Sequence, residues 1–174
     1  MNFFSKSTFN VLKTYFFSML VLVLTLCLTF IKVVEASAES RYALVIGNGN
    51  YKVGRLKNPP QDAQLMGETL KGLGFELIGG KALLNLGREA LAQSVLDFGD
   101  KLRSSRGIGL FYYAGHGVQV RGKNYLIPVD AKMERAEHME IYAVPIDQVL
   151  VQMETAQNKL NLMILDACRN NPFP

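Results

Sequence analysis

The sequence predicts an α/β domain built on a mostly parallel sheet with helices on both faces. Four apolar runs between residues 42 and 165 are suited to buried strands, and helical patterns separate them. The runs are continuous rather than alternating, which is typical of strands buried on both faces. Alternation of strands with helices favours parallel strands joined by crossover helices. The sequence shows no repeats, low-complexity tracts or internal linkers.

The first half of this domain is predicted to hold two strands and two helices. Residues 47–50 form a Gly/Asn turn after the first strand. Prolines after Asn58 suit the first turn of a helix, and Gly74 suits its end. The later helix has an apolar face with three- and four-residue spacing. The expected elements are a strand over 42–46, a helix over 58–72, a strand over 75–78 and a helix over 87–105.

The second half is predicted to hold two strands, a hairpin and a helix. The third main strand runs into a glycine-rich corner at 115–117, and Gly122 lies in the hairpin turn. Residues 131–144 are expected to be a polar loop of mixed charge. The expected elements are a strand over 107–114, hairpin strands over 118–120 and 125–127, a helix over 145–156 and a strand over 160–165.

Residues 1–38 have the pattern of a secretory signal peptide. Two lysines precede Phe16–Ile31, a stretch of sixteen residues without charge, and small residues at Ala36 and Ala38 follow it. The pattern predicts cleavage after Ala38 and export to the periplasm or the medium. The alternative is a membrane anchor over residues 16–34, which would provide the protein's membrane contact.

The net charge and the cysteine content limit the possible functions of residues 39–174. Without residues 1–38 the chain keeps 16 basic and 14 acidic side chains, a net charge of +2. This balance argues against a nucleic-acid partner. One cysteine remains, Cys168, so an intrachain disulfide is excluded. An unpaired cysteine in an exported protein is either an intermolecular partner or a reactive thiol.

A histidine and a cysteine at strand ends are the candidate catalytic pair. Ligands bind beyond the carboxyl ends of parallel strands, and His116 and Cys168 follow the third and fourth strands. An imidazole can take a thiol proton and later protonate a leaving amine. The backbone amides of Gly117 and Cys168 are candidate oxyanion donors. The alternatives are a buried structural cysteine and a hydrogen-bonded structural histidine.

Two carboxylates accompany the candidate pair. Asp166 lies two residues before Cys168, and Asp62 lies near the start of the first helix of the domain. Together they would select an arginine or lysine side chain by charge-assisted hydrogen bonds. For Asp62 the alternative is stabilisation of the helix dipole. The other histidine, His138, is expected to be solvated.

A glycine-rich stretch after the first strand raises the alternative of a nucleotide site. The stretch GNGNYKVG places its third glycine at Gly54, which is the wrong spacing for a dinucleotide loop. Prolines also replace the glycine-rich entry into the following helix. The motif therefore argues against nucleotide binding.

Four motifs, in order, resemble the caspase-like cysteine peptidases, and the metacaspase-like (orthocaspase) branch most of all. The resemblance covers residues 41–174 and implies a three-layer caspase-like fold. It implies a Cys168 nucleophile, His116 as base and acid, a Gly117 oxyanion donor, and Asp62 and Asp166 in a pocket for Arg or Lys. The motifs are RYALVIGNGNY, LKNPPQDAQLM, GLFYYAGHG and LMILDACRNNPF.

The resemblance also raises the question of a metal requirement. No cofactor is required by the sequence, but some metacaspases need calcium. The sequence offers only a weak acidic candidate, made of Glu134, Glu137 and Glu140.

The sequence departs from the family in two places. Where the caspase signature Q-A-C-[RQG]-G has glutamine and glycine at its ends, this chain has Asp166 and Asn170. The negative charge of Asp166 disfavours acidic substrates. Family members continue after the cysteine through two strands and a helix, so residues 39–174 would be a truncated, large-subunit-like region. We therefore expect either a fragment or a second chain that completes the sheet. The alternative function is a caspase-like interaction module that no longer cleaves.

Overall fold

The computed structural model describes residues 6–34, 39–132, 135 and 138–167, which divide into two compact units, 1–38 and 39–174. The first unit holds a single helix, α1 (Lys6–Val34). Its stretch Asn10–Cys27 is long and apolar enough to cross a membrane, a property that signal sequences near an N-terminus share. The apolar run seen in the sequence lies within this helix.

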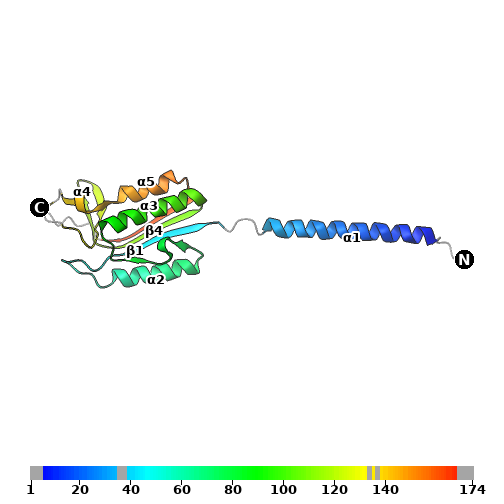
Figure 1. Ribbon diagram of the computed structural model, residues 1–174, viewed down its shortest axis with the longest axis horizontal. Coiled ribbons are helices and arrows are strands. Elements are labelled where there is room, and N and C mark those ends of the chain that lie inside the picture. Colours follow the sequence, from blue (N-terminus) through cyan, green and yellow to red (C-terminus); the bar gives the residue numbers. More distant parts are fainter. Residues whose placement is uncertain (1–5, 35–38, 133–134, 136–137, 168–174) are drawn as a thin grey trace. The chain divides into compact units, whose positions relative to one another are not determined.

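The second unit is organised by a parallel sheet, as the sequence predicted (Figure 1). Its strand order is β2-β1-β4-β8, and β3 also pairs with β1; every pair is parallel. The long strands β1 and β4 are buried runs, because each lies between two helical layers. The prediction that the last strand is buried is wrong, because the residues of β8 are exposed or half-buried at the edge of the sheet. The strands are β1 (Arg41–Gly47), β2 (Glu76–Leu77), β3 (Leu83–Leu84), β4 (Ile108–Gly115) and β8 (Leu160–Ala167).

Helices cover both faces of the sheet, which confirms the predicted three-layer arrangement (Figure 1). On one face α2 (Pro59–Gly72) packs against alternate residues of β1 and β4. On the other face α3 (Arg88–Ser105) and α5 (Ile146–Thr155) pack against the intervening residues. The side-chain period of two sends successive strand residues into the two cores. The apolar face predicted for α3 is buried throughout: Leu91, Val95, Phe98 and Leu102.

A small antiparallel sheet extends from the end of β4. The predicted hairpin forms β5 (Gly117–Val120) and β6 (Lys123–Leu126), and β7 (Val144–Pro145) adds a third strand. The expected polar loop over 131–144 is wrong in part, because α4 (His138–Tyr142) and β7 form within it. Met139 and Ala143 are buried against this sheet, and this packing stabilises α4.

Within the described residues, β8 has one neighbour, β4, and so forms an edge of the sheet. Met163, Leu165 and Ala167 pack towards the core beneath α3 and α5. On the other face Leu160, Leu162 and Ile164 are 45%, 40% and 41% exposed. This edge therefore presents an apolar row to its surroundings.

Candidate functional site

The register of the sheet aligns the strand ends that carry the candidate site. Gly47 of β1 pairs with Ala114 of β4, and Gly115 pairs with Ala167 of β8. The parallel strands therefore end at one edge, where His116 follows β4. Cys168 is the next residue after Ala167 in the sequence and lies outside the described residues.

The imidazole of His116 is held by a backbone carbonyl. Its Nε2 lies 2.6 Å from the carbonyl oxygen of Gly54. A carbonyl only accepts, so in the neutral ring the proton is on Nε2 and Nδ1 has the free lone pair. This arrangement leaves Nδ1 as the atom that can accept a proton.

Gly54 belongs to a loop that the protein holds in place next to the histidine. Gly54 has a φ of 71°, and a Cβ there would lie 3.2 Å from His116 Nε2. The loop is closed by a hydrogen bond from the Leu56 N–H to the Gly49 carbonyl oxygen, 2.9 Å long. Glycine therefore supplies both the left-handed backbone and the close approach that the histidine contact needs.

Two tyrosines contact the backbone and ring of His116. The Tyr51 ring packs against the imidazole with 4.4 Å between centroids, and its hydroxyl accepts the His116 N–H at 2.9 Å. The Tyr113 hydroxyl donates to the His116 carbonyl oxygen, also at 2.9 Å. Burial raises the pKa of Tyr51, and it raises the pKa of Tyr113 well above its ordinary value. Both hydroxyls therefore stay protonated near neutral pH.

Two asparagines fix the turn that leads into this loop. The fully buried Asn48 donates to the carbonyl oxygens of Leu86 and Ile127 and accepts the Leu86 N–H. The Asn85 side-chain oxygen accepts the N–H groups of Gly49 and Asn50 at 3.0 and 2.9 Å. The sequence placed Asn48 in a turn and predicted nothing for Asn85, because the partners of both side chains lie far along the chain.

The glycines of the GNGN turn are needed for packing within the domain. A Cβ at Gly47 would lie 2.4 Å from the Pro59 carbonyl oxygen and 2.6 Å from the Ala63 Cβ. A Cβ at Gly49 would lie 2.4 Å from the Leu56 carbonyl oxygen. These close contacts give Gly47 and Gly49 a structural role in the packing of the domain.

Gly117 opens β5 immediately after His116. It pairs with Leu126, and the Ile127 N–H donates to the His116 carbonyl oxygen at 3.1 Å. This pattern makes Gly117 and Leu126 a non-hydrogen-bonded pair, so the Gly117 N–H points away from β6. The amide is thus not used by the hairpin ladder.

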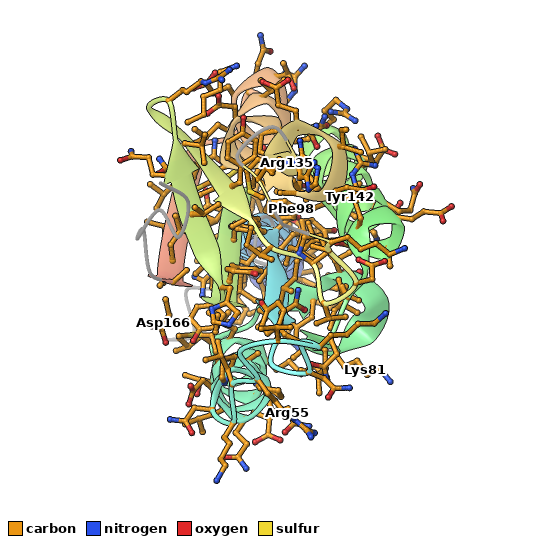
Figure 2. All side chains as sticks on the ribbon, turned by 90° about the vertical axis from the view of Figure 1, so that its left-hand side faces the viewer. Arg55, Lys81, Phe98, Arg135, Tyr142 and Asp166 are labelled. Atoms are coloured by element: carbon orange, nitrogen blue, oxygen red, sulfur yellow. The ribbon has the colours of Figure 1, made fainter. Side chains whose placement is uncertain are left out.

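Asp62 and Asp166 both lie on the side of the sheet that α2 covers. Asp62 is in the first turn of α2, and Asp166 pairs with Ala114, which belongs to the core beneath α2. The pKa of Tyr112 is raised by burial first, then by the charge of Asp166 and then by that of Asp62. Both carboxylates therefore lie within electrostatic range of one hydroxyl. Figure 2 views the domain from this end and labels Asp166.

The remaining candidate residues are not assembled into this site. His138, expected to be solvated, is half-buried in α4, and its ring meets Tyr142 edge-on at 5.8 Å between centroids. Of the three acids considered for calcium, Glu134 and Glu137 lie outside the described residues, and Glu140 is exposed. Within the part of the chain that the structure describes, no group of three His, Cys, Asp or Glu side chains can hold a metal ion.

Comparison with known proteins agrees with this fold. The family model of the caspase domain (Peptidase C14) matches residues 40–173. The human mucosa-associated lymphoid tissue lymphoma translocation protein 1 is 33% identical over 135 residues, which are 76% of this chain. Its mouse homolog matches with the same identity over the same length. The chain spans 15% of the length of these relatives. The protein described here therefore belongs to the caspase-domain family of peptidases.

Proposed function

We propose that this chain is a cysteine endopeptidase that cuts after arginine or lysine through a His116–Cys168 dyad. The observation that carries the proposal is the His116 imidazole, whose Nε2 faces the Gly54 carbonyl and whose Nδ1 is left for proton transfer. This imidazole follows β4 at the end of the sheet where β8 also ends. The last residue of β8, Ala167, immediately precedes Cys168 in the sequence. Membership of the caspase-domain family supports cysteine peptidase chemistry.

In the proposed reaction His116 moves the proton and Cys168 forms the covalent bond. His116 takes the thiol proton, and the thiolate sulfur attacks the scissile carbonyl carbon. The carbonyl π electrons move to oxygen, where the N–H groups of Gly117 and Cys168 would stabilise the charge. The tetrahedral intermediate expels the amine, which takes the proton from His116. Water then attacks the thioester, giving its proton to His116, and the thiolate leaves.

Selection of a basic residue is proposed for Asp62 and Asp166. Neither carboxylate has a hydrogen-bond or ion-pair partner among the described residues, and both act on the Tyr112 hydroxyl. A guanidinium or ammonium group would supply the missing partner. An aspartate side chain in the same place would be repelled.

Peptide hydrolysis tests this function directly. The full chain in detergent is given fluorogenic peptides that end in Arg, Lys or Asp, with and without calcium, beside a Cys168→Ala control. Cleavage after Arg and Lys that Cys168→Ala abolishes is the expected result. Equal activity in Cys168→Ala, or a preference for Asp, would contradict the proposal. The calcium arm tests the metal requirement, for which the described residues offer no site.

A second candidate function is a caspase-like interaction module, and the exposed row on β8 favours it. Leu160, Leu162 and Ile164 lie on the edge strand of the sheet, as a surface completed by another chain would require. An electrophilic probe with a basic recognition group separates the two functions. Labelling at Cys168 supports the peptidase, whereas a folded chain that never labels supports the module.

The N-terminal unit is proposed to direct export, with cleavage after Ala38. The apolar helix α1 supports either a signal sequence or an anchor. N-terminal sequencing of the protein from cell fractions decides between them. A mature N-terminus at Glu39 supports the signal, and an intact N-terminus in the membrane fraction supports the anchor over residues 16–34.

A further inference from the structure

Tyr51 and Tyr113 form a closed set of hydrogen bonds with His116. The His116 N–H donates to the Tyr51 hydroxyl, and the Tyr113 hydroxyl donates to the His116 carbonyl oxygen. The two hydroxyls lie 3.2 Å apart, so the Tyr51 proton can close the ring through Tyr113. Both backbone polar groups of the histidine are therefore bound by tyrosine side chains.

Tyr51 is connected to both ends of the contact that orients the imidazole. Its backbone belongs to the loop that carries Gly54, the acceptor of the Nε2 hydrogen bond. Its hydroxyl holds the backbone of His116, the donor residue, and its ring packs against the imidazole. Movement of Tyr51 would therefore change the position of the donor and of the acceptor together.

Gly115 makes room for the hydroxyl pair. A Cβ at this position would lie 2.7 Å from the Tyr51 hydroxyl oxygen and 2.8 Å from that of Tyr113. Such distances are shorter than real Cβ contacts, so a larger residue would push the hydroxyls away. The absence of a side chain at Gly115 therefore allows both tyrosine hydroxyls to lie next to the backbone of His116.

The hydroxyls are also tied to the hairpin that follows the histidine. Both lie within hydrogen-bond distance of the Ile127 carbonyl oxygen, at 3.2 Å for Tyr51 and 3.0 Å for Tyr113. The Asn48 side chain donates to the same oxygen. The ring of hydrogen bonds is therefore anchored to three segments of the chain.

We propose that Tyr51 and Tyr113 are positioning residues that hold His116 as the tautomer with its proton on Nε2. The inference rests on the proposed role of His116 in peptide cleavage. Neither tyrosine contacts the substrate in this scheme. Each acts through the backbone of His116, and Tyr51 acts also through the loop that supplies the Gly54 carbonyl.

The test uses the full chain in detergent, labelled with nitrogen-15. Tyr51→Phe and Tyr113→Phe keep each ring and remove its hydroxyl. Tyr42→Phe is the matched control, because Tyr42 lies near the start of β1, at the opposite end of that strand. A long-range proton–nitrogen spectrum reports the His116 tautomer, and His138→Gln leaves one histidine to assign. In parallel, kcat and KM are measured on an Arg peptide.

The expected result separates positioning from general stability. Wild type and Tyr42→Phe should show the Nε2–H tautomer, whereas Tyr51→Phe and Tyr113→Phe should show both tautomers. Loss of one hydrogen bond to the histidine should lower kcat about tenfold and leave KM within about twofold. A tautomer change without any peptide cleavage would support the positioning role and reject the proposed peptidase function.

Two results would overturn the inference. One is a wild-type His116 that carries its proton on Nδ1, which needs no variant. The other is Tyr51→Phe with unchanged tautomer and unchanged kcat. Because Tyr113 is fully buried, Tyr51→Phe decides the matter if Tyr113→Phe fails to fold.

Discussion

His116 and the carboxylates of Asp62 and Asp166 share one edge of the sheet but differ in how the protein holds them. The backbone N–H, the carbonyl oxygen and Nε2 of His116 all have protein partners. The two carboxylates have none within the described residues, and Asp166 is exposed. The histidine proposed as the base is thus oriented in advance, whereas the carboxylates proposed to bind a cation keep no partner among the described residues.

The difference follows from the chemical role proposed for each group. Proton transfer needs a fixed direction, which hydrogen bonds fixed by the fold supply at no cost during the reaction. Recognition of a cation needs uncompensated negative charge, since an internal ion pair would have to break first. The comparison predicts that substitutions around the histidine affect kcat, whereas substitutions of the acids affect KM and substrate choice.

The largest effect is expected from removing the base. His116→Ala should lower kcat/KM on an Arg peptide by about 10²- to 10⁴-fold, because proton transfer at Nδ1 is lost. Hydrolysis rates under excess enzyme measure the effect. His138→Ala is the control, as His138 lies in α4 and not at this edge. Equal losses in the two variants would show that His116 has no special role.

Neutralising the acids should come next in size. Asp62→Asn and Asp166→Asn should each raise KM for an Arg peptide about 10- to 100-fold, because a charged partner is worth about 1.5–3 kcal/mol. Removing one of two unpaired charges should leave the free energy of unfolding unchanged or slightly higher. Paired KM and urea measurements check both statements.

Asp97→Asn, on the exposed side of α3, is the matched control for the acids. It should leave KM unchanged. A KM that stays constant in Asp62→Asn and Asp166→Asn as well would remove these residues from the recognition of basic side chains.

Substitution in the loop that carries the Nε2 acceptor should have a smaller effect. Gly54→Ala forces a side chain into a left-handed backbone, at about 1–2 kcal/mol, and crowds His116 Nε2. We expect kcat to fall about tenfold with little change in KM. Gly72→Ala is the control, since a Cβ there meets nothing within 4 Å. A change in KM without a change in kcat would contradict the prediction that the surroundings of His116 affect kcat and the acids affect KM.

The smallest expected effect is a pH dependence of stability. Burial raises the pKa of Tyr113 in the folded state above its ordinary value of about 10. Its contribution is therefore complete below pH 10 and is lost as pH rises through the folded-state pKa. Urea unfolding at pH 8 and pH 10.5 should show lower stability at the higher pH. Tyr113→Phe should reduce that difference, and an unchanged difference would exclude Tyr113 as its source.

The sequence predicted the main strands and helices because their patterns are local and long. Leu44 and Ile46 face one core while Ala43 and Val45 face the other, which produces a continuous apolar run. The two-residue strands β3 and β7 have no such pattern. Their pairing depends on neighbours distant in sequence, β1 for the first and β6 for the second.

The candidate site was predictable as residue types at strand ends, but its supporting contacts were not. His116 and Asp166 stand out because each follows an apolar run. Tyr51 lies 65 residues from His116, and Asn48 lies 79 residues from Ile127, so no local spacing connects them. Tyr51 and Tyr113 look like ordinary core aromatics in the sequence, because only the folded chain brings their hydroxyls to the histidine.

The hydrogen bonds around His116 have a consequence for the timing of activity during the life of the chain. They join the segments near residues 51, 113 and 127, so they form only when distant parts of the domain have come together. In a chain that is still being synthesised, these contacts are absent and the imidazole of His116 has no fixed orientation. The proposed peptidase activity would therefore be acquired only after the domain has folded.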